Sequence, residues 1–147
     1  MMKIKRLLAL MKQLYLYADE EFYGFGEKFT NFCKRGQTIN CWQTDALSTN
    51  TEKSYKNHPF FMSSRGYAIL LNTYTRSKFE MGSFSNVAYN MSVEDKVLDY
   101  VIWMGNDYKA LLKSYINQTG KIPMIPKWLW DFGCQNVHIK LKMKFMK

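Results

Sequence analysis

The sequence predicts a mainly β protein, an antiparallel β-sandwich followed by one C-terminal amphipathic helix and a proline-rich strap. Short apolar or alternating runs recur about every ten residues between turn residues, as is typical of sandwiches. Aromatic residues make up 16% of the 147 residues, and their large side chains suit half-buried pleated surfaces. The hydrophobic period changes to helical spacing once, near residue 107.

The first half of the chain contains three predicted strands. The first, Gln13 to Tyr17, precedes an acidic turn at Asp19 to Glu21. The second, Tyr23 to Phe29, alternates glycine with aromatic residues, and glycine within a strand often marks a bulge or a close backbone approach. A dinucleotide-binding loop is excluded because its third glycine and following helix are missing. The third strand, Ile39 to Trp42, lies inside a long polar excursion, Asn31 to Asn57.

From Pro59 onward, strands alternate with turns. Of these strands, Val97 to Met104 is almost entirely apolar, so we expect a central strand that is covered on both faces. The predicted strands are Phe60 to Ser63, Tyr67 to Asn72, Lys78 to Met81, Val87 to Met91 and Val97 to Met104.

Apolar side chains at helical spacing predict one helix over residues 107–119. Asn106 or Asp107 can cap its start, and Gly120 fits the left-handed residue that ends many helices. The predicted packing stripe consists of Tyr108, Leu111, Leu112, Tyr115 and Ile116.

Two stretches after this helix have extended patterns. Ile122 to Trp128 contains two prolines and is expected to be a stiff strap toward another domain. Val137 to Phe145 alternates apolar residues with polar ones, mostly lysine, which predicts an edge strand.

The net charge of +9 does not predict a nucleic-acid partner, because the charge is confined to the two ends. Four basic residues lie in the first twelve positions and four in the last eight, and all 12 acidic residues lie between them. Residues 13–134 therefore carry 13 basic and 12 acidic side chains, a net charge of only +1.

The cysteines and histidines predict neither a disulfide framework nor a metal site. Cys33, Cys41 and Cys134 are odd in number, and none forms a C-x-x-C pair. His58 and His138 have no partner at ligand spacing, so no metal or other cofactor is expected, and His58 is interpreted as structural.

We also expect no membrane partner and a cytoplasmic location. The N-terminal apolar run, Leu7 to Met11, is too short for the core of a signal peptide, and no run reaches membrane-spanning length.

Three motifs together resemble the N-terminal β-sandwich region of glycoside hydrolase family 31, which contains retaining α-glucosidases and α-xylosidases. They are Y-G-F-G-E-K-F at Tyr23 to Phe29, W-Q-T-D at Trp42 to Asp45, and the stretch Y-K-N-H-P-F-F-M-S-S-R-G-Y from Tyr55 to Tyr67. The resemblance covers roughly Tyr15 to Gly133 and implies a galactose-mutarotase-like sandwich that precedes a (β/α)8 barrel. The Tyr55 stretch favours the α-xylosidase branch.

This resemblance implies two domains and no catalytic residue. Residues 1–121 are expected to be a partial sandwich domain with its closing helix, and residues 122–147 the strap and a truncated or aberrant start of the barrel. The family's two catalytic aspartates lie on barrel strands, and no position here matches either motif. The aspartates of this chain are scattered over different elements, so we expect no glycosidase activity from it alone: Asp45, Asp95, Asp99, Asp107 and Asp131.

The resemblance also gives two candidate substrate contacts, Trp42 and Asp45. In the family, an aspartate in a W-N-R-D-like motif contacts sugar, and W-Q-T-D matches that motif at both ends. Thr44 replaces its arginine. The alternative for Asp45 is a turn residue that bonds its own backbone.

The sequence is compatible with three functions. The first is a fragment of a retaining family 31 α-glycosidase, which would act on an α-linked glucoside or xyloside if a barrel completed it. The second is a non-catalytic carbohydrate-binding module. The third is an interaction protein that self-associates through uncovered apolar surface.

Overall fold

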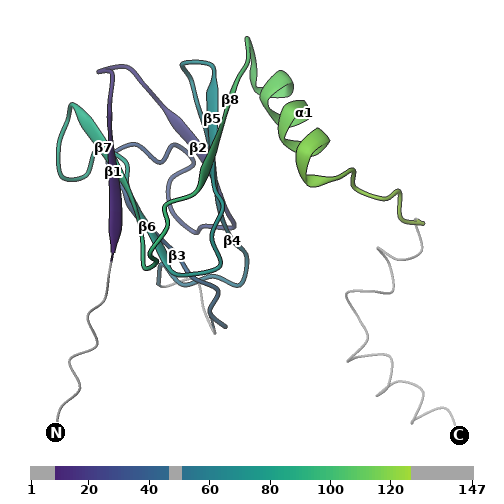
Figure 1. The fold of residues 1–147 in the computed structure, drawn as a ribbon, viewed down its shortest axis with the longest axis horizontal. Coiled ribbons are helices and arrows are strands. Elements are labelled where there is room, and N and C mark those ends of the chain that lie inside the picture. The colour runs from purple at the N-terminus through teal and green to yellow at the C-terminus, as the bar shows by residue number, and fades with distance from the viewer. Residues whose placement is uncertain (1–8, 47–50, 127–147) are drawn as a thin grey trace, which may run out of the picture. The chain divides into compact units, whose positions relative to one another are not determined.

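Two four-stranded antiparallel sheets pack face to face as a sandwich, and one helix follows them in the part of the chain that the computed structural model describes, residues 9–46 and 51–126 (Figure 1). Sheet A has the strand order β1-β7-β6-β3, and sheet B has the order β2-β4-β5-β8. The predicted sandwich with one later helix is confirmed. The elements are β1 (Leu10–Tyr15), β2 (Phe22–Gly26), β3 (Thr38–Cys41), β4 (Asn57–Ser63), β5 (Tyr67–Leu71), β6 (Ser77–Glu80), β7 (Ala88–Val93), β8 (Tyr100–Met104) and α1 (Tyr108–Thr119).

The chain divides into two compact units, Met1–Tyr115 and Ile116–Lys147. Both sheets lie in the first unit. Of the second unit, the structure describes the last residues of α1 and a segment without regular structure that runs to residue 126. The expected strand at Val137 to Phe145 lies outside the described residues, and the boundary at residues 121 and 122 stays a prediction.

The main core lies between the two sheets and is rich in aromatic side chains. Phe25 stacks on Phe61 with ring centroids 5.3 Å apart and also contacts Phe79 across the sandwich at 4.9 Å. Such ring pairs add about 1 kcal/mol each beyond the area that they bury. The buried members are Leu16, Phe22, Phe25, Ile39, Cys41, Phe61, Ile69, Leu71, Phe79, Met81, Tyr89, Met91 and Val93.

Strands β4 and β5 are apolar on both faces because a second cluster lies on the outer face of sheet B. Phe61 points into the sandwich, while its neighbour Phe60 points outward and packs with Ala68 and Leu111. The helix α1 supplies Leu111 and thereby covers this face. The alternation of strand side chains between two dry faces explains why the run at Pro59 to Met62 contains no polar residue.

The termini of α1 follow the sequence prediction. The Asp107 side chain accepts a hydrogen bond from the backbone N–H of Ala110 at 2.6 Å, which is an N-cap. Gly120 has a φ of +112°, a region that glycine enters without steric cost. Within the predicted stripe, Leu111 is fully buried, whereas Tyr108 and Leu112 are each 39% exposed.

His58 links β4 to the same helix. Its Nε2 atom lies 2.7 Å from the hydroxyl oxygen of Tyr115, and the two rings meet edge to face. Burial lowers the pKa of His58 below its usual value. The interpretation of His58 as a structural residue agrees with this contact.

Strand β2 contains the bulge that its glycines predict. The pairing of β2 with β4 shifts between Gly24 and Gly26, and Phe25 has a φ of +69°. A Cβ atom at Gly24 would lie 2.5 Å from the Phe60 carbonyl oxygen, and one at Gly26 would lie 2.1 Å from that of Lys56. The bulge places Phe25 in the core, where it is fully buried.

The prediction of a central strand at Val97 to Met104 is wrong. β8 begins only at Tyr100, pairs with β5, and forms an edge of sheet B. Ile102 and Met104 are 48% and 75% exposed. An apolar run indicates a strand, but it does not show whether the strand has a neighbour on both sides.

No helix in the described residues is both long enough and apolar enough to span a membrane.

Replacing Leu111 with alanine is expected to lower the free energy of unfolding by about 3 kcal/mol, because it leaves a cavity under α1. Leu112→Ala removes the same atoms from a partly exposed position and is expected to cost less than about 1 kcal/mol. Urea unfolding of both variants measures the difference. Equal losses would contradict the packing of α1 on sheet B.

We expect the free energy of unfolding to fall as the pH drops below about 6.5, the usual pKa of histidine. Because the pKa of His58 is lower in the folded chain, the unfolded chain binds the proton more tightly and is favoured as the pH falls through the folded pKa. Urea midpoints against pH measure this, and the slope is expected to be shallower in His58→Gln. An unchanged slope in that variant would exclude His58 as the source.

Candidate functional site

A pocket of about 270 Å³ lies on the outer side of sheet A, where β3 ends. Ile39 and Cys41 point into the core, so the alternating residues Asn40, Trp42 and Thr44 face outward. The loop before β4 closes the pocket from the other side. The lining residues are Asn40, Trp42, Thr44, Glu52, Lys53 and Arg76.

Trp42 is the aromatic wall of this pocket and is 47% exposed. Cys41 pairs with Ser77 in the register of β3 and β6, so one further step places Trp42 opposite Arg76. The guanidinium carbon of Arg76 lies 5.4 Å from the centre of the Trp42 ring. This cation–π contact fixes the indole at the pocket and leaves part of it open to a ligand.

A carboxylate and an amide form the polar side of the pocket. The Asn40 amide nitrogen donates to both carboxylate oxygens of Glu52, at 2.9 and 2.8 Å. Behind them, the Lys28 ammonium donates to the backbone carbonyls of Asn40 (2.7 Å) and Glu52 (3.3 Å), and burial lowers the pKa of Lys28. Lys28 therefore ties the loop to β3 and holds Glu52 beside Asn40.

Asn57 holds the segment that carries Trp42. Its side-chain amide donates to the carbonyls of Trp42 (2.7 Å) and Ser54 (2.8 Å). The side chain of Gln43 bonds both the N–H (2.9 Å) and the carbonyl (3.0 Å) of Asn57, as a neighbouring strand would. Sequence reasoning missed Asn57, and its only signal is a polar residue at the start of a mostly apolar strand.

Asp45 is exposed and is not among the residues that line the pocket. The next residue, Ala46, is buried, and its carbonyl accepts a hydrogen bond from the Tyr55 hydroxyl. Of the two candidate contacts, the structure places Trp42 at the pocket and Asp45 on the exposed surface three residues further along the chain.

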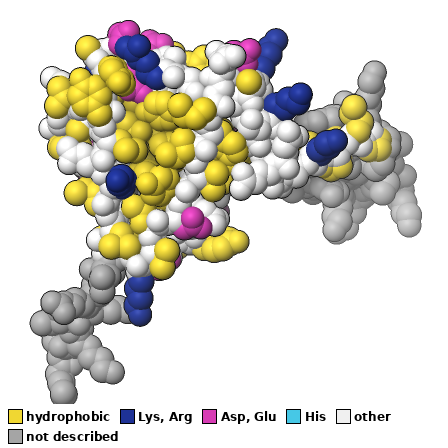
Figure 2. All heavy atoms as spheres, turned by 45° about the horizontal axis from the view of Figure 1, so that its top comes forward, with side chains coloured by type: hydrophobic (Ala, Val, Ile, Leu, Met, Phe, Trp, Pro, Cys, Tyr) yellow, Lys and Arg dark blue, Asp and Glu magenta, His cyan; other side chains and the backbone are white. Residues whose placement is uncertain are grey.

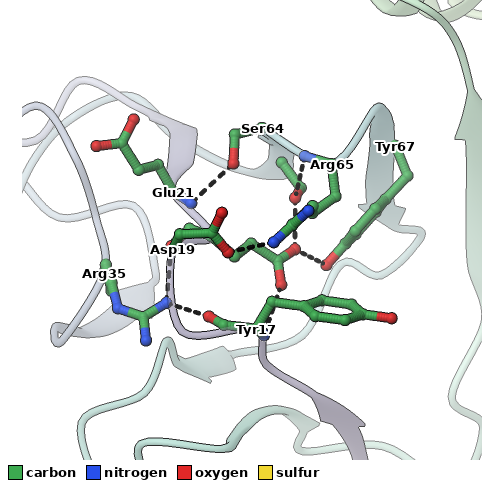
Figure 3. Close-up of polar contacts among 9 residues, drawn as sticks. Tyr17, Asp19, Glu21, Arg35, Ser64, Arg65 and Tyr67 are labelled. Atoms are coloured by element: carbon green, nitrogen blue, oxygen red, sulfur yellow. Dashed lines mark hydrogen bonds and ion pairs between the residues drawn. The ribbon is translucent and has the colours of Figure 1, made fainter.

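A second polar cluster, at the corner between β1 and β2, is structural (Figure 3). Glu20 is fully buried and accepts hydrogen bonds from Ser63, from the Tyr67 hydroxyl at 2.6 Å and from the backbone N–H of Tyr17 at 3.2 Å. Burial, together with this bond to Glu20, raises the pKa of Tyr67. The sequence suggested only an acidic turn here, and the three bonds leave Glu20 inaccessible to a ligand.

The corner is closed by two arginines that hold its outer side. Arg35 donates to the carbonyls of Tyr17 and Glu20, both at 2.8 Å, and Arg65 forms an ion pair with Asp19 (Figure 3). These contacts fix the segment that connects β1 to β2. The cluster is therefore interpreted as structural.

The described residues contain no metal site, and their two cysteines are unpaired. No group of three or more histidine, cysteine or acidic side chains there is suitable for a metal ion. Cys33 and Cys41 are free thiols, and burial raises the pKa of Cys41 to about 11, so this thiol stays protonated.

Residues 10–80 match the model of the glycosyl hydrolase 31 N-terminal galactose mutarotase-like domain. The chain belongs to this domain family. It is 39% identical over 124 residues to alpha-xylosidase XylQ of Lactiplantibacillus pentosus and 37% identical over 123 residues to an alpha-xylosidase of Emericella nidulans. These alignments cover 84% and 82% of the chain, but it spans only 16% of either relative.

A solved structure with the same fold is the family 31 dextranase of Flavobacterium johnsoniae in complex with glucose. The TM-score is 0.78 at 37% sequence identity, over 82% of this chain and 15% of the dextranase. The family 31 sandwich of this chain therefore corresponds to a small part of a larger enzyme in each of these relatives.

Asn57→Ala is expected to lower the free energy of unfolding by about 2 kcal/mol, because it removes the side-chain bonds to the Trp42 carbonyl and to the buried Ser54 hydroxyl. Asn72→Ala, which removes a side-chain bond to the exposed Asp99, is the matched control and is expected to cost less than about 1 kcal/mol. Chemical unfolding compares the two variants. A smaller loss in Asn57→Ala than in Asn72→Ala would contradict the role of Asn57.

Proposed function

We propose that this chain is the N-terminal sandwich of a family 31 α-glycosidase that acts on α-linked xylosides or glucosides, and that it supplies substrate contacts instead of catalytic groups. The pocket beside Trp42 carries the proposal. An open aromatic face next to charged hydrogen-bonding groups suits a pyranose ring, whose faces are apolar and whose rim is hydroxylated. The names of the two relatives that are 39% and 37% identical favour a xyloside.

In this proposal Trp42 and Asp45 have different roles. The half-exposed indole of Trp42 meets a sugar face from the pocket. The exposed carboxylate of Asp45 accepts hydrogen bonds from sugar hydroxyls, and a charged acceptor makes such bonds stronger than a neutral one. Thr44, which lies between them in the sequence, lines the pocket and adds a hydroxyl group.

Catalysis is assigned to another part of the enzyme. A retaining glycosidase needs two carboxyl groups about 5 Å apart across the scissile bond. Several described carboxylates already have structural partners: Glu20 is buried at the corner, Asp107 caps α1, and Asp99 bonds the side chain of Asn72 at 2.7 Å. The chain by itself is therefore proposed to be inactive.

The proposal includes the arrangement and location of the parts. Residues 1–121 form the sandwich domain with its closing helix, and residues 122–147 lead into the barrel domain. Pro123 and Pro126 support a strap at this place, because neither residue can continue a helix. The unpaired thiols of Cys33 and Cys41 support a cytoplasmic location.

A chimera tests the substrate contact directly. In it, the sandwich of this chain replaces the corresponding segment of alpha-xylosidase XylQ, and hydrolysis of an aryl α-xyloside is measured. Asp45→Asn is expected to lower kcat/KM by about ten- to a hundredfold, because a charged hydrogen bond to the sugar is lost. Trp42→Ala is expected to reduce it as well.

Asp95→Asn is the matched control, because Asp95 is partly exposed, does not line the pocket and accepts a hydrogen bond from the backbone N–H of Lys96. It is expected to leave kcat/KM unchanged. Equal kcat/KM values for the parent chimera and Asp45→Asn would contradict the substrate contact. Turnover by the unfused 147-residue chain above a buffer blank would contradict the assignment of catalysis to another domain.

The second candidate is a carbohydrate-binding module that works without a barrel, and the open face of Trp42 favours it. Titration of the free chain with xylose, glucose and maltose distinguishes the two functions. Saturable fluorescence quenching that Trp42→Phe abolishes supports the module, whereas its absence supports the enzyme domain.

A further inference from the structure

Three of the four edge strands of the sandwich carry a device that discourages further strand pairing. In β1 the device is Lys12, which lies opposite the fully buried Met91 in the register and is itself exposed. Lys12 is therefore a charged residue on the inward side of an edge strand. Such residues oppose edge-to-edge association, because pairing would bury their charge.

The edges formed by β2 and β3 are protected in other ways. The bulge in β2 gives three successive residues a positive φ, from Gly24 to Gly26, so this edge is not a regular template for another strand. In β3 the backbone carbonyl of Asn40 accepts a hydrogen bond from the Lys28 ammonium at 2.7 Å. A carbonyl that already accepts a hydrogen bond from an ammonium group is a poorer acceptor for the backbone N–H of an incoming strand.

The edge formed by β8 has none of these devices. Its five residues, Tyr100 to Met104, include no charged side chain, and all five pair with β5 in an unbroken register. Ile102 lies opposite Ile69, a core residue, yet 48% of Ile102 is exposed. The face drawn in Figure 2 likewise carries a broad apolar area, so the sandwich leaves hydrophobic surface uncovered.

We propose that a second copy of this chain pairs with β8, through antiparallel β8–β8 pairing about a twofold axis at Ile102. Sheet B of one copy then continues into sheet B of the other. Main-chain hydrogen bonds between the two edges supply the affinity, as in other strand-addition complexes.

The order of residues in β8 is what selects a second copy as the occupant. A twofold axis at Ile102 places this residue opposite itself, Tyr100 opposite Met104, and Val101 opposite Trp103. Each pair is apolar and lies on one face of the joined sheet, and such cross-strand pairs are favourable. One step further, the exposed Asp99 meets Gly105, which has no side chain, so no like charges face each other.

Sedimentation equilibrium of the 147-residue chain over a wide range of concentrations tests the proposal. The chain is expected to pass from monomer to dimer and to stop there, because the twofold pairing uses up the edge. Ile102→Lys places two ammonium groups opposite each other and is expected to abolish the dimer. Val97→Lys is the matched control at a 65% exposed position outside the strand, and it is expected to remain a dimer.

A cross-linking variant covers the case in which Ile102→Lys fails to fold. Ile102→Cys, in a chain whose Cys33, Cys41 and Cys134 are replaced by alanine, is expected to form a disulfide-linked dimer on oxidation. Opposed residues of an antiparallel pair have Cα atoms about 5 Å apart, within reach of a disulfide. Val97→Cys in the same background is expected to stay unlinked.

A chain that is monomeric at every concentration would overturn the proposal. So would a dimer that persists in folded Ile102→Lys, an assembly that grows beyond the dimer, or equal cross-linking of the Ile102→Cys and Val97→Cys variants.

Discussion

The burial of β4 and β5 on both faces is the constraint on which the rest of the structure depends. Phe61 and Ile69 fill the space between the sheets, while Phe60 and Ala68 need a cover on the outside. Leu111 of α1 provides that cover, so the helix is part of the sandwich and not an appendage to it. Most of the hydrophobic free energy of the described chain lies in these two layers.

Strand β4 also positions the candidate site. Asn57 is the first residue of β4, and its side chain holds the carbonyl of Trp42 from the long polar excursion. A rigid buried strand thus fixes a segment that has little apolar side-chain volume of its own. Arg76, which directly precedes β6 of sheet A, then fixes the Trp42 indole that forms the aromatic wall of the pocket. A ligand site on loops held by a packed scaffold is a common arrangement.

Features with a local cause were predictable from the sequence, and features with a distant cause were not. Asp107 and Gly120 mark the ends of α1 by the chemistry of single positions, so the helix was found correctly. Glu20 looked like any turn carboxylate, because its burial depends on Ser63 and Tyr67, more than forty residues away. Trp42 and Asp45 were predicted only from the family resemblance, and of these two only Trp42 lines the pocket. The side chains that line the pocket come from three separate segments of the chain, which no local pattern brings together.

The bulge in β2 has a consequence for how the chain reaches its native pairing. The backbone of Gly24 and Gly26 touches the carbonyls of Phe60 and Lys56, where any side chain would collide. If β2 slipped by one residue along β4, Phe25 or Tyr23 would be driven against those carbonyls, and the aromatic ring that fills the core would turn to water. The misaligned pairing of β2 with β4 is thus disfavoured by steric clash. Gly24 and Gly26 therefore fix the register of β2 on β4.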